Sequence, residues 1–190
     1  MSEHKNIGSK FILDACCGGR CFWINKKHPN TIYIDNEPRA VGISVQRPLF
    51  KCEPDIVMDF TNLKFSDGRF KLVVWDPPHL LGLNETSEMR KKYGTLNKQT
   101  WKWDLKKGFD ECWRVLANYG VLIFKWNESD IATADVLKLF SEDPLFGHVT
   151  GSKSKTKWFC FMKILKDDSY GYSNVRKDVH SDIEGGNKST

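Results

Sequence analysis

Short apolar runs and helical stripes alternate along this chain. Runs of β-branched and bulky residues at 10–15, 31–35, 55–60, 70–75 and 121–124 lack polar alternation, which predicts strands buried on both faces of a parallel sheet. Between the last two, apolar residues at helical spacing from Leu105 to Leu116 predict an amphipathic helix that ends at the turn 118–120. The pattern therefore favours an α/β fold.

The C-terminal half continues the pattern. Ser129 or Asp130 is a suitable cap for a helix that reaches Phe140. Val149 belongs to a predicted sixth strand, 157–165 to a seventh, and a basic loop at 151–156 connects them. We expect one domain over 1–166, with a seven-stranded, mostly parallel sheet and helices on both faces, followed by a disordered polar tail over 167–190.

Acidic residues end the first four predicted strands. They are Asp14, Asp35, Asp59 and Asp76. Because the carboxyl ends of parallel strands meet at one edge of a sheet, we expect these carboxylates to face a common ligand site. The glycines at 18 and 19 would let the backbone approach that ligand closely.

Two prolines follow the acid of the fourth strand. Pro77 and Pro78 lack a backbone N–H and have a fixed φ, so they end the strand and hold its last carbonyls rigidly. Asp76 and the Pro77 carbonyl can together accept both hydrogens of a planar NH2 group. A turn after a buried strand is the simpler explanation of the same residues.

Two motifs resemble those of a known enzyme class. Asp76-Pro-Pro-His79 resembles the Asp/Asn-Pro-Pro-aromatic motif of the S-adenosylmethionine-dependent amino-methyltransferases, with histidine at the aromatic position. The stretch from Asp14 to Arg20 is similar to the first motif of class I methyltransferases, Asp-x-x-x-Gly-x-Gly, with Arg20 at the last glycine. The resemblance covers about residues 10–166 and implies the Rossmann-like class I methyltransferase fold.

The resemblance also implies roles for individual residues. The cofactor S-adenosylmethionine would be held by Asp14, Ala15, Cys16 and Gly18 at the first strand, by Asp35 and Asn36 at its ribose, and by Asp59 and Phe60 at its adenine. For Asp35, capping of the turn before Pro38 is the alternative. Asp76, Pro77 and Pro78 would orient the acceptor amine and His79 would pack against its ring, in a direct transfer without metal.

Basic and aromatic residues are interleaved in the polar segment 82–107, which has no apolar run and is expected to be a substrate loop or lid. The formal net charge of the chain is +5. This composition suits phosphate contact and base stacking, although a solvated loop whose tryptophans fold back on the core would also explain it. The candidate substrate-binding residues are Lys91, Lys92, Lys98, Trp101, Trp103 and, after the fifth strand, Lys125.

The preferred function is therefore methyl transfer to an exocyclic amino nitrogen of a nucleic-acid base in DNA or RNA, adenine N6 or cytosine N4. Two alternatives remain at this point. One is an amine methyltransferase acting on a protein side chain or a small molecule. The other is a catalytically silent, methyltransferase-like subunit that binds nucleic acid. The segment 82–107 is short for a DNA recognition region, which weakens the DNA version.

Cysteine usage and hydropathy indicate the cellular compartment. The six cysteines follow no apolar signal segment, so we expect reduced thiols, and no second Cys or His pair at zinc spacing accompanies Cys16, Cys17 and Cys21. No apolar run approaches the roughly 20 residues of a membrane span. We expect a cytoplasmic protein without a metal or a membrane partner, whose oligomeric state the sequence does not specify.

Overall fold

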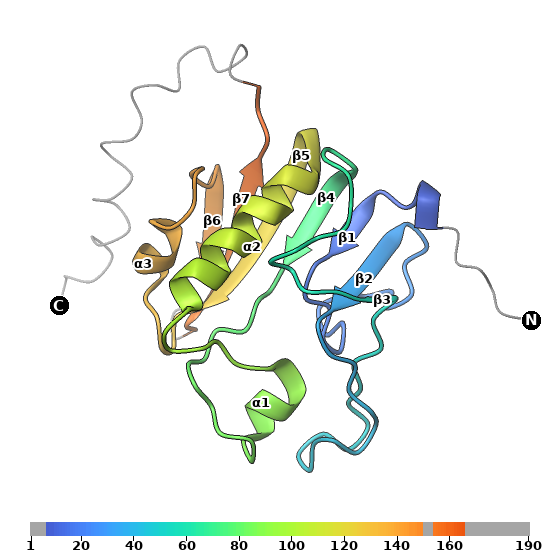
Figure 1. Cartoon of the computed structure of the whole chain (residues 1–190), viewed down its shortest axis with the longest axis vertical. Coiled ribbons are helices and arrows are strands. Elements are labelled where there is room, and N and C mark those ends of the chain that lie inside the picture. Colours follow the sequence, from blue (N-terminus) through green and yellow to red (C-terminus); the bar gives the residue numbers. More distant parts are fainter. Residues whose placement is uncertain (1–6, 150–153, 166–190) are drawn as a thin grey trace, which may run out of the picture.

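A seven-stranded sheet with the order β3-β2-β1-β4-β5-β7-β6 forms the centre of the molecule (Figure 1). The computed structural model describes residues 7–149 and 154–165. The strands are β1 (Ile12–Asp14), β2 (Thr31–Asp35), β3 (Ile56–Val57), β4 (Phe70–Trp75), β5 (Leu116–Asn127), β6 (Phe146–Val149) and β7 (Thr156–Met162). The helices are η1 (Ile7–Ser9), α1 (Glu88–Tyr93), α2 (Trp101–Val115) and α3 (Thr133–Leu137).

The sheet is mostly parallel, as predicted. Strands β3, β2, β1, β4 and β5 run parallel, whereas β7 is antiparallel to both β5 and β6. The strand order reverses between β1 and β4, so the loops after these two strands diverge to opposite sides and leave a crevice. Ligands of open α/β sheets bind at this kind of switch point.

The main hydrophobic core lies between the sheet and α2. Leu105, Phe109 and Cys112 of α2 are fully buried against the sheet. Phe140, after α3, stacks on Phe109 with 4.2 Å between ring centroids. Gly108 lets the helix come close, because a Cβ there would lie 2.5 Å from the Phe60 ring.

The crossover segments after β1 and β2 differ from the expectation of helices on both faces. Residues 15–30 and 36–55 contain turns and bends but no helix, and the second segment extends past the carboxyl end of β2 toward α1 (Figure 1). The second segment contains three prolines and is closed by paired backbone hydrogen bonds of 2.9 Å between Arg39 and Cys52. Proline removes donors that a helix needs, which explains the loop.

Several element boundaries also differ from the predictions. The segment 82–107 contains α1 and the start of α2, so Trp101 and Trp103 are helical. Helix α2 leads directly into β5, and the predicted turn at 118–120 is an irregularity of that strand, with Tyr119 at φ 59°. The β4 partners in β5 jump from Leu116 to Val121, and pairing with β7 begins at Val121, so the residues in between bulge out of the ladder where the turn signal of Gly120 lies.

The predicted cap of α3 is wrong. The helix begins at Thr133, and Glu128 accepts hydrogen bonds from the Thr133 N–H at 3.4 Å and hydroxyl at 2.7 Å. The side chain of Ser129 instead donates to Asn127. Strand β7 ends at Met162, before the predicted end at 165. Parts of the predicted basic loop 151–156 and all of the tail 167–190 lie outside the described residues.

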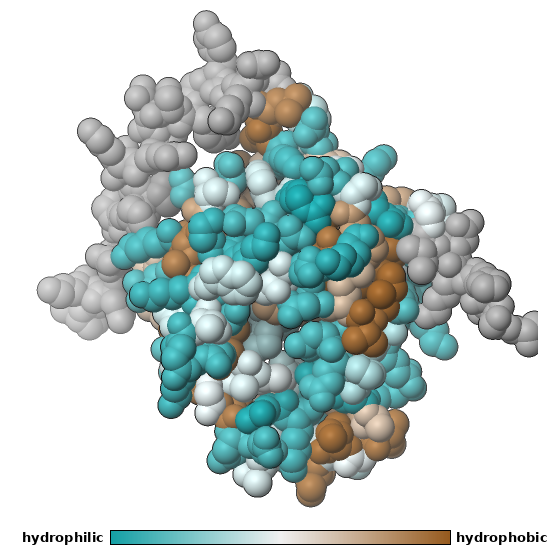
Figure 2. Space-filling view, viewed as in Figure 1, coloured by the Kyte–Doolittle hydropathy of each residue, from teal (hydrophilic) through white to brown (hydrophobic). Residues whose placement is uncertain are grey.

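The surface seen with α2 in front is largely hydrophilic (Figure 2). A hydrophobic area lies at the end of the molecule near α1, where the segment 36–55 carries four exposed aliphatic residues. They are Val41, Ile43, Val45 and Leu49. None of the helices in the described ranges has the length and apolar character needed to cross a membrane.

Candidate active site

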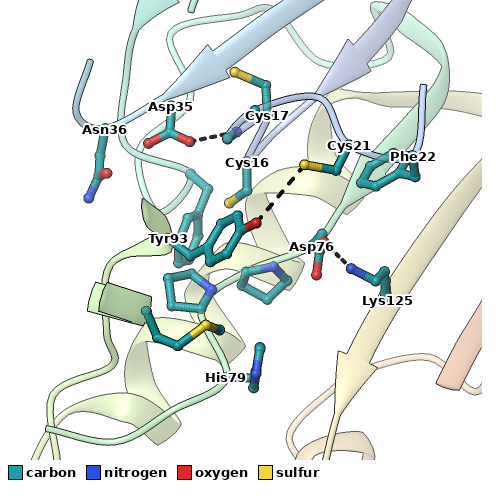
Figure 3. Close-up of a pocket in the computed structure, with 16 residues that line it drawn as sticks. Cys16, Cys17, Cys21, Phe22, Asp35, Asn36, Asp76, His79, Tyr93 and Lys125 are labelled. Carbon is teal, nitrogen blue, oxygen red and sulfur yellow. Dashed lines mark hydrogen bonds and ion pairs between the residues drawn. The ribbon is translucent and has the colours of Figure 1, made fainter. Parts of the chain in front are cut away.

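A pocket of about 250 Å³ opens at the carboxyl ends of β1, β2, β4 and β5 (Figure 3). It gathers residues that are up to 109 positions apart in the chain. The lining residues are Cys16, Cys17, Gly18, Gly19, Cys21, Phe22, Asp35, Asn36, Phe60, Asp76, Pro77, Pro78, His79, Met89, Tyr93 and Lys125. The structure therefore brings the predicted glycine turn and the Asp-Pro-Pro corner to one site.

The glycine turn is held by the end of β2. The Cys17 N–H donates to the Ile34 carbonyl at 2.8 Å, and the Gly18 N–H donates to Asp35 Oδ2 at 3.0 Å. Gly18 has φ 46°, which an L side chain rarely adopts, and a Cβ on Gly19 would lie 2.7 Å from the Phe50 ring. Gly18 is thus required by the backbone path and Gly19 by its packing against Phe50, and both line the pocket.

Arg20 takes the place of the third glycine without entering the pocket. Its φ of 53° is the conformation that glycine favours. The guanidinium lies 3.7 Å from the Tyr33 ring centroid and donates to the carbonyls of Lys26 at 2.6 Å and Glu53 at 2.7 Å. Arg20 fastens the segment 15–30 to the sheet.

Asp35 is paired with a buried cation. Arg39 is 6% exposed and donates to Asp35 Oδ1 at 3.0 Å. The Glu37 N–H also donates to Oδ1, at 3.3 Å, so Asp35 supports the turn after β2 as well as lining the pocket. Each carboxylate oxygen has two lone pairs, so these contacts leave acceptor capacity for a ligand hydroxyl.

Asp76 forms an ion pair with Lys125 across the pocket (Figure 3). Lys125 Nζ lies 2.5 Å from Asp76 Oδ2. Burial raises the pKa of Asp76, and the ammonium of Lys125 opposes this shift. The pair therefore favours an ionised, strongly accepting carboxylate at the end of β4.

His79 lies on the side of Asp76 that faces away from Lys125 (Figure 3). Its ring meets Trp126 edge-on, with 6.4 Å between centroids. Burial lowers the pKa of His79, which favours a neutral imidazole.

Asp14 and Ala15 lie behind the pocket wall. Asp14 is completely buried, and its Oδ2 accepts a 2.7 Å hydrogen bond from the Trp23 indole N–H. Burial raises the pKa of Asp14 to about 7. Ala15 is buried and donates its N–H to Val74. Neither residue lines the pocket.

The two residues predicted to bind the adenine of the cofactor lie in different environments. Phe60 lines the pocket, whereas Asp59 is exposed and its Oδ1 accepts hydrogen bonds from the Thr61 N–H at 2.7 Å and hydroxyl at 2.8 Å.

The predicted substrate residues are dispersed. Among them, Lys125 alone lines the pocket. Lys91 pairs with Glu88 at 3.3 Å, and Lys92 is 5% exposed. Lys98 is exposed and lies along Gly82, Trp101 packs against the main core, and Trp103 is 61% exposed.

Sequence reasoning missed Phe22 and Tyr93. Tyr93, the last residue of α1, lies against Gly18, and its hydroxyl is 4.0 Å from Cys21 Sγ. Met89 of the same helix lines the pocket too. An aromatic residue shortly after the glycine turn was the available signal for Phe22. Tyr93 is one of the aromatic residues of the predicted substrate segment 82–107, but nothing there singles it out.

One group of metal-type ligands occurs among the described residues. Cys17, Asp35 and Cys52 have ligand atoms within 4.8 Å of one another. Arg39 already pairs with Asp35, and the hydrogen bond with Cys52 together with burial raises the pKa of Cys17. Thiolate formation is therefore disfavoured, so this cluster is poorly suited to a cation.

Comparison with known proteins concerns the fold. No protein-family model matches the sequence, and no curated protein matches it. The PH0226 protein from Pyrococcus horikoshii OT3 is similar in structure, with 13% sequence identity and a TM-score of 0.53 over 81% of each chain. A SAM-dependent methyltransferase from Leishmania major gives 15% identity and a TM-score of 0.50, over 80% of this chain and 64% of that chain. Together with the strand order, these similarities show that the chain has the Rossmann-like class I methyltransferase fold.

Proposed function

We propose that this protein is an S-adenosylmethionine-dependent methyltransferase that acts on an exocyclic amino nitrogen of a nucleic-acid base, adenine N6 or cytosine N4. One observation carries the proposal. The Asp76 carboxylate and the Pro77–Pro78 corner line the same pocket as the glycine turn and Asp35. A hydrogen-bond acceptor for an amine and a turn suited to a nucleoside therefore line one cavity.

The lining of the pocket supports the proposed cofactor. Gly18 and Gly19 line the pocket beside Asp35, whose Oδ2 accepts one hydrogen bond from the Gly18 N–H and can accept another from a ribose hydroxyl. The carboxylates of Asp35 and Asp76 line the pocket, each already paired with a cation of the protein, Arg39 and Lys125 respectively. Phe60 offers an apolar surface for the adenine. The bound cofactor would supply an electrophilic methyl group.

The protein's own residues then orient the acceptor. Asp76 accepts a hydrogen bond from the amine and so directs the nitrogen lone pair, while the fixed prolines hold the corner still. Burial raises the pKa of Asp76, and the ion pair with Lys125 opposes that rise and so favours the ionised carboxylate. Positioning and acceptor electrostatics supply the catalysis.

Lys125 favours a neutral aromatic amine as acceptor. An aliphatic ammonium, such as a protein lysine, would meet the positive charge of Lys125 beside Asp76 and would first have to lose a proton. An amine on a heteroaromatic base is neutral at pH 7. Its ring nitrogen or carbonyl can accept a hydrogen bond from Lys125. A base in a duplex would have to be flipped out to reach the pocket.

Labelled S-adenosylmethionine tests this function directly. The purified protein is incubated with separate pools of DNA, RNA and protein, and labelled products are identified by digestion to nucleosides or peptides. We expect label on an exocyclic amine of DNA or RNA. Label on protein alone would support the amine-methyltransferase alternative, and nucleic-acid binding without transfer would support the silent subunit.

A further inference from the structure

We infer that the acceptor ring stacks on Phe22, in a subsite formed by the loop after β1, and not on His79 at the motif's aromatic position. This inference rests on the proposed function and specifies its acceptor subsite: a planar heteroaromatic ring whose amine reaches Asp76. Phe22 lines the pocket that contains Asp76 and Lys125.

The ammonium group of Lys125 lies close to both Phe22 and the Asp76 carboxylate. Lys125 Nζ is 2.5 Å from Asp76 Oδ2 and 5.7 Å from the centroid of the Phe22 ring. A base whose amine contacts Asp76 is several ångströms wide, so its ring would extend over this neighbourhood. Figure 3 shows Phe22 on the Lys125 side of Asp76 and His79 on the opposite side.

Contacts of Phe22 and of its neighbours in sequence hold the Phe22 ring in place. Its ring meets Trp158 of β7 edge-on, with 5.5 Å between centroids. On one side of it in sequence, Arg20 packs on Tyr33; on the other, Trp23 donates to Asp14 and meets Tyr33 edge-on at 5.2 Å. These contacts fix the loop on both sides of Phe22, so its ring is preorganised for stacking.

Three other aromatic rings line the pocket, namely Phe60, at the part proposed for the adenine of the cofactor, His79 and Tyr93. His79 meets Trp126 edge-on, as Phe22 meets Trp158, but its imidazole offers a smaller face than phenylalanine. Tyr93 lies over Gly18 and its hydroxyl contacts Cys21, which places it at the cofactor turn. Phe22 thus provides the wall on the Lys125 side of the acceptor amine site.

Stacking can be measured without turnover. A single-stranded oligonucleotide containing 2-aminopurine is titrated with protein saturated with S-adenosylhomocysteine, and quenching of the probe reports stacking; unlabelled adenine- or cytosine-containing strands are competitors. We expect Phe22→Leu to weaken binding about 10-fold and to reduce the quenching, because a stacked base contributes roughly 1–3 kcal/mol. Phe22→Tyr and Phe22→Trp should retain both.

Matched variants separate the three rings. His79→Leu should leave quenching near the parent value, and Tyr93→Leu should weaken S-adenosylhomocysteine binding, measured by calorimetry, more than it changes quenching. Unchanged cofactor affinity in Phe22→Leu verifies its fold; if that variant does not fold, Phe22→Trp must still quench at least as strongly as the parent.

Opposite results would overturn the inference. It fails if Phe22→Leu binds and quenches like the parent, if His79→Leu has the larger effect, or if the parent binds no probe or competitor. The proposed function fails separately, through an absence of methyl transfer to nucleic acid. Stacking on Phe22 without transfer would leave the inference intact, and transfer unaffected by Phe22→Leu would leave the function intact.

Discussion

At the scale of single residues, two strand-end acids that look equivalent in the sequence have different environments. Asp14 is completely buried and its nearest side-chain partner is the neutral Trp23 indole, whereas Asp76 lines the pocket and pairs with Lys125. Burial raises the pKa of both, but only at Asp76 does a cation oppose the shift. Asp14 is thus suited to fixing the loop after β1, and Asp76 to contacting substrate.

Asp14 should make stability fall as pH rises. Its pKa is about 7 in the folded protein against 3.8 ordinarily, so between those values the folded state retains a proton that the unfolded state has released. The parent should lose as much as roughly 4 kcal/mol of unfolding free energy from this group between about pH 4 and pH 7. Asp14→Asn should show a shallower decline in urea titrations. Equal pH dependence in the two proteins would contradict the assignment.

Asp76 should matter for chemistry more than for cofactor binding. Asp76→Ala removes an acceptor for the amine while leaving Asp35 and the glycine turn intact, so single-turnover methyl transfer should fall on the order of 10²-fold or more. Asp76→Asn should be milder because its side-chain oxygen still accepts a hydrogen bond. Calorimetry with S-adenosylhomocysteine is the control. Transfer at the parent rate in Asp76→Ala would rule out the proposed role.

At the scale of elements, α2 positions the Asp76 corner from behind. Gly108 brings the helix close to both Phe60, in the pocket wall, and Trp75, the residue before Asp76. The predicted apolar stripe of α2 is buried, as expected. Close contact between α2 and the end of β4 is therefore part of how the pocket keeps its shape.

Gly108→Ala should destabilise the protein although alanine is the better helix former. The new Cβ would lie 2.5 Å from the Phe60 ring and 2.7 Å from the Trp75 ring, so packing must be displaced. We expect a loss of about 1–3 kcal/mol in urea unfolding, since overpacking outweighs the gain in helix propensity. Lys102→Ala, at an exposed site of the same helix, is the control and should stay within about 0.5 kcal/mol. A stabilised Gly108→Ala would show that the helix moves away freely.

At the scale of the whole molecule, the positive charge is spread over the surface and is not concentrated in the pocket. Lys91 lies on α1 and Lys98 between α1 and α2, whereas Lys92 is buried. Among these three lysines, we therefore expect phosphate contacts around the pocket from Lys91 and Lys98 and not from Lys92.

Nucleic-acid affinity should fall steeply with salt. Replacing Lys91 and Lys98 together by glutamine should reduce the slope of log K against log[salt] by about 1.5, because each lost phosphate contact removes about 0.7–0.9. Lys138 follows α3, and its side chain is 63% exposed. Lys138→Gln is therefore the control and should leave the slope unchanged. A slope that is the same in all three proteins would exclude Lys91 and Lys98 from the nucleic-acid contact.

The sequence by itself determined the fold class and the chemistry at the strand ends. Continuous apolar runs need burial on both faces, and an acid or proline ends such a run locally, so β2 and β4 and the Asp76-Pro77-Pro78 corner could be located without the structure. Parallel topology then places strand-end residues at one edge, which accounts for the shared pocket of Asp35 and Asp76.

Tertiary structure alone decided which side chains meet there. Phe22, Tyr93 and Lys125 come from segments far apart in the chain, and their approach depends on packing against Trp158, Gly18 and Asp76. Burial likewise separated Asp14 from the pocket. Local sequence encodes backbone preferences over a few residues, whereas these contacts arise from the folded neighbours of each side chain, which local pattern does not specify.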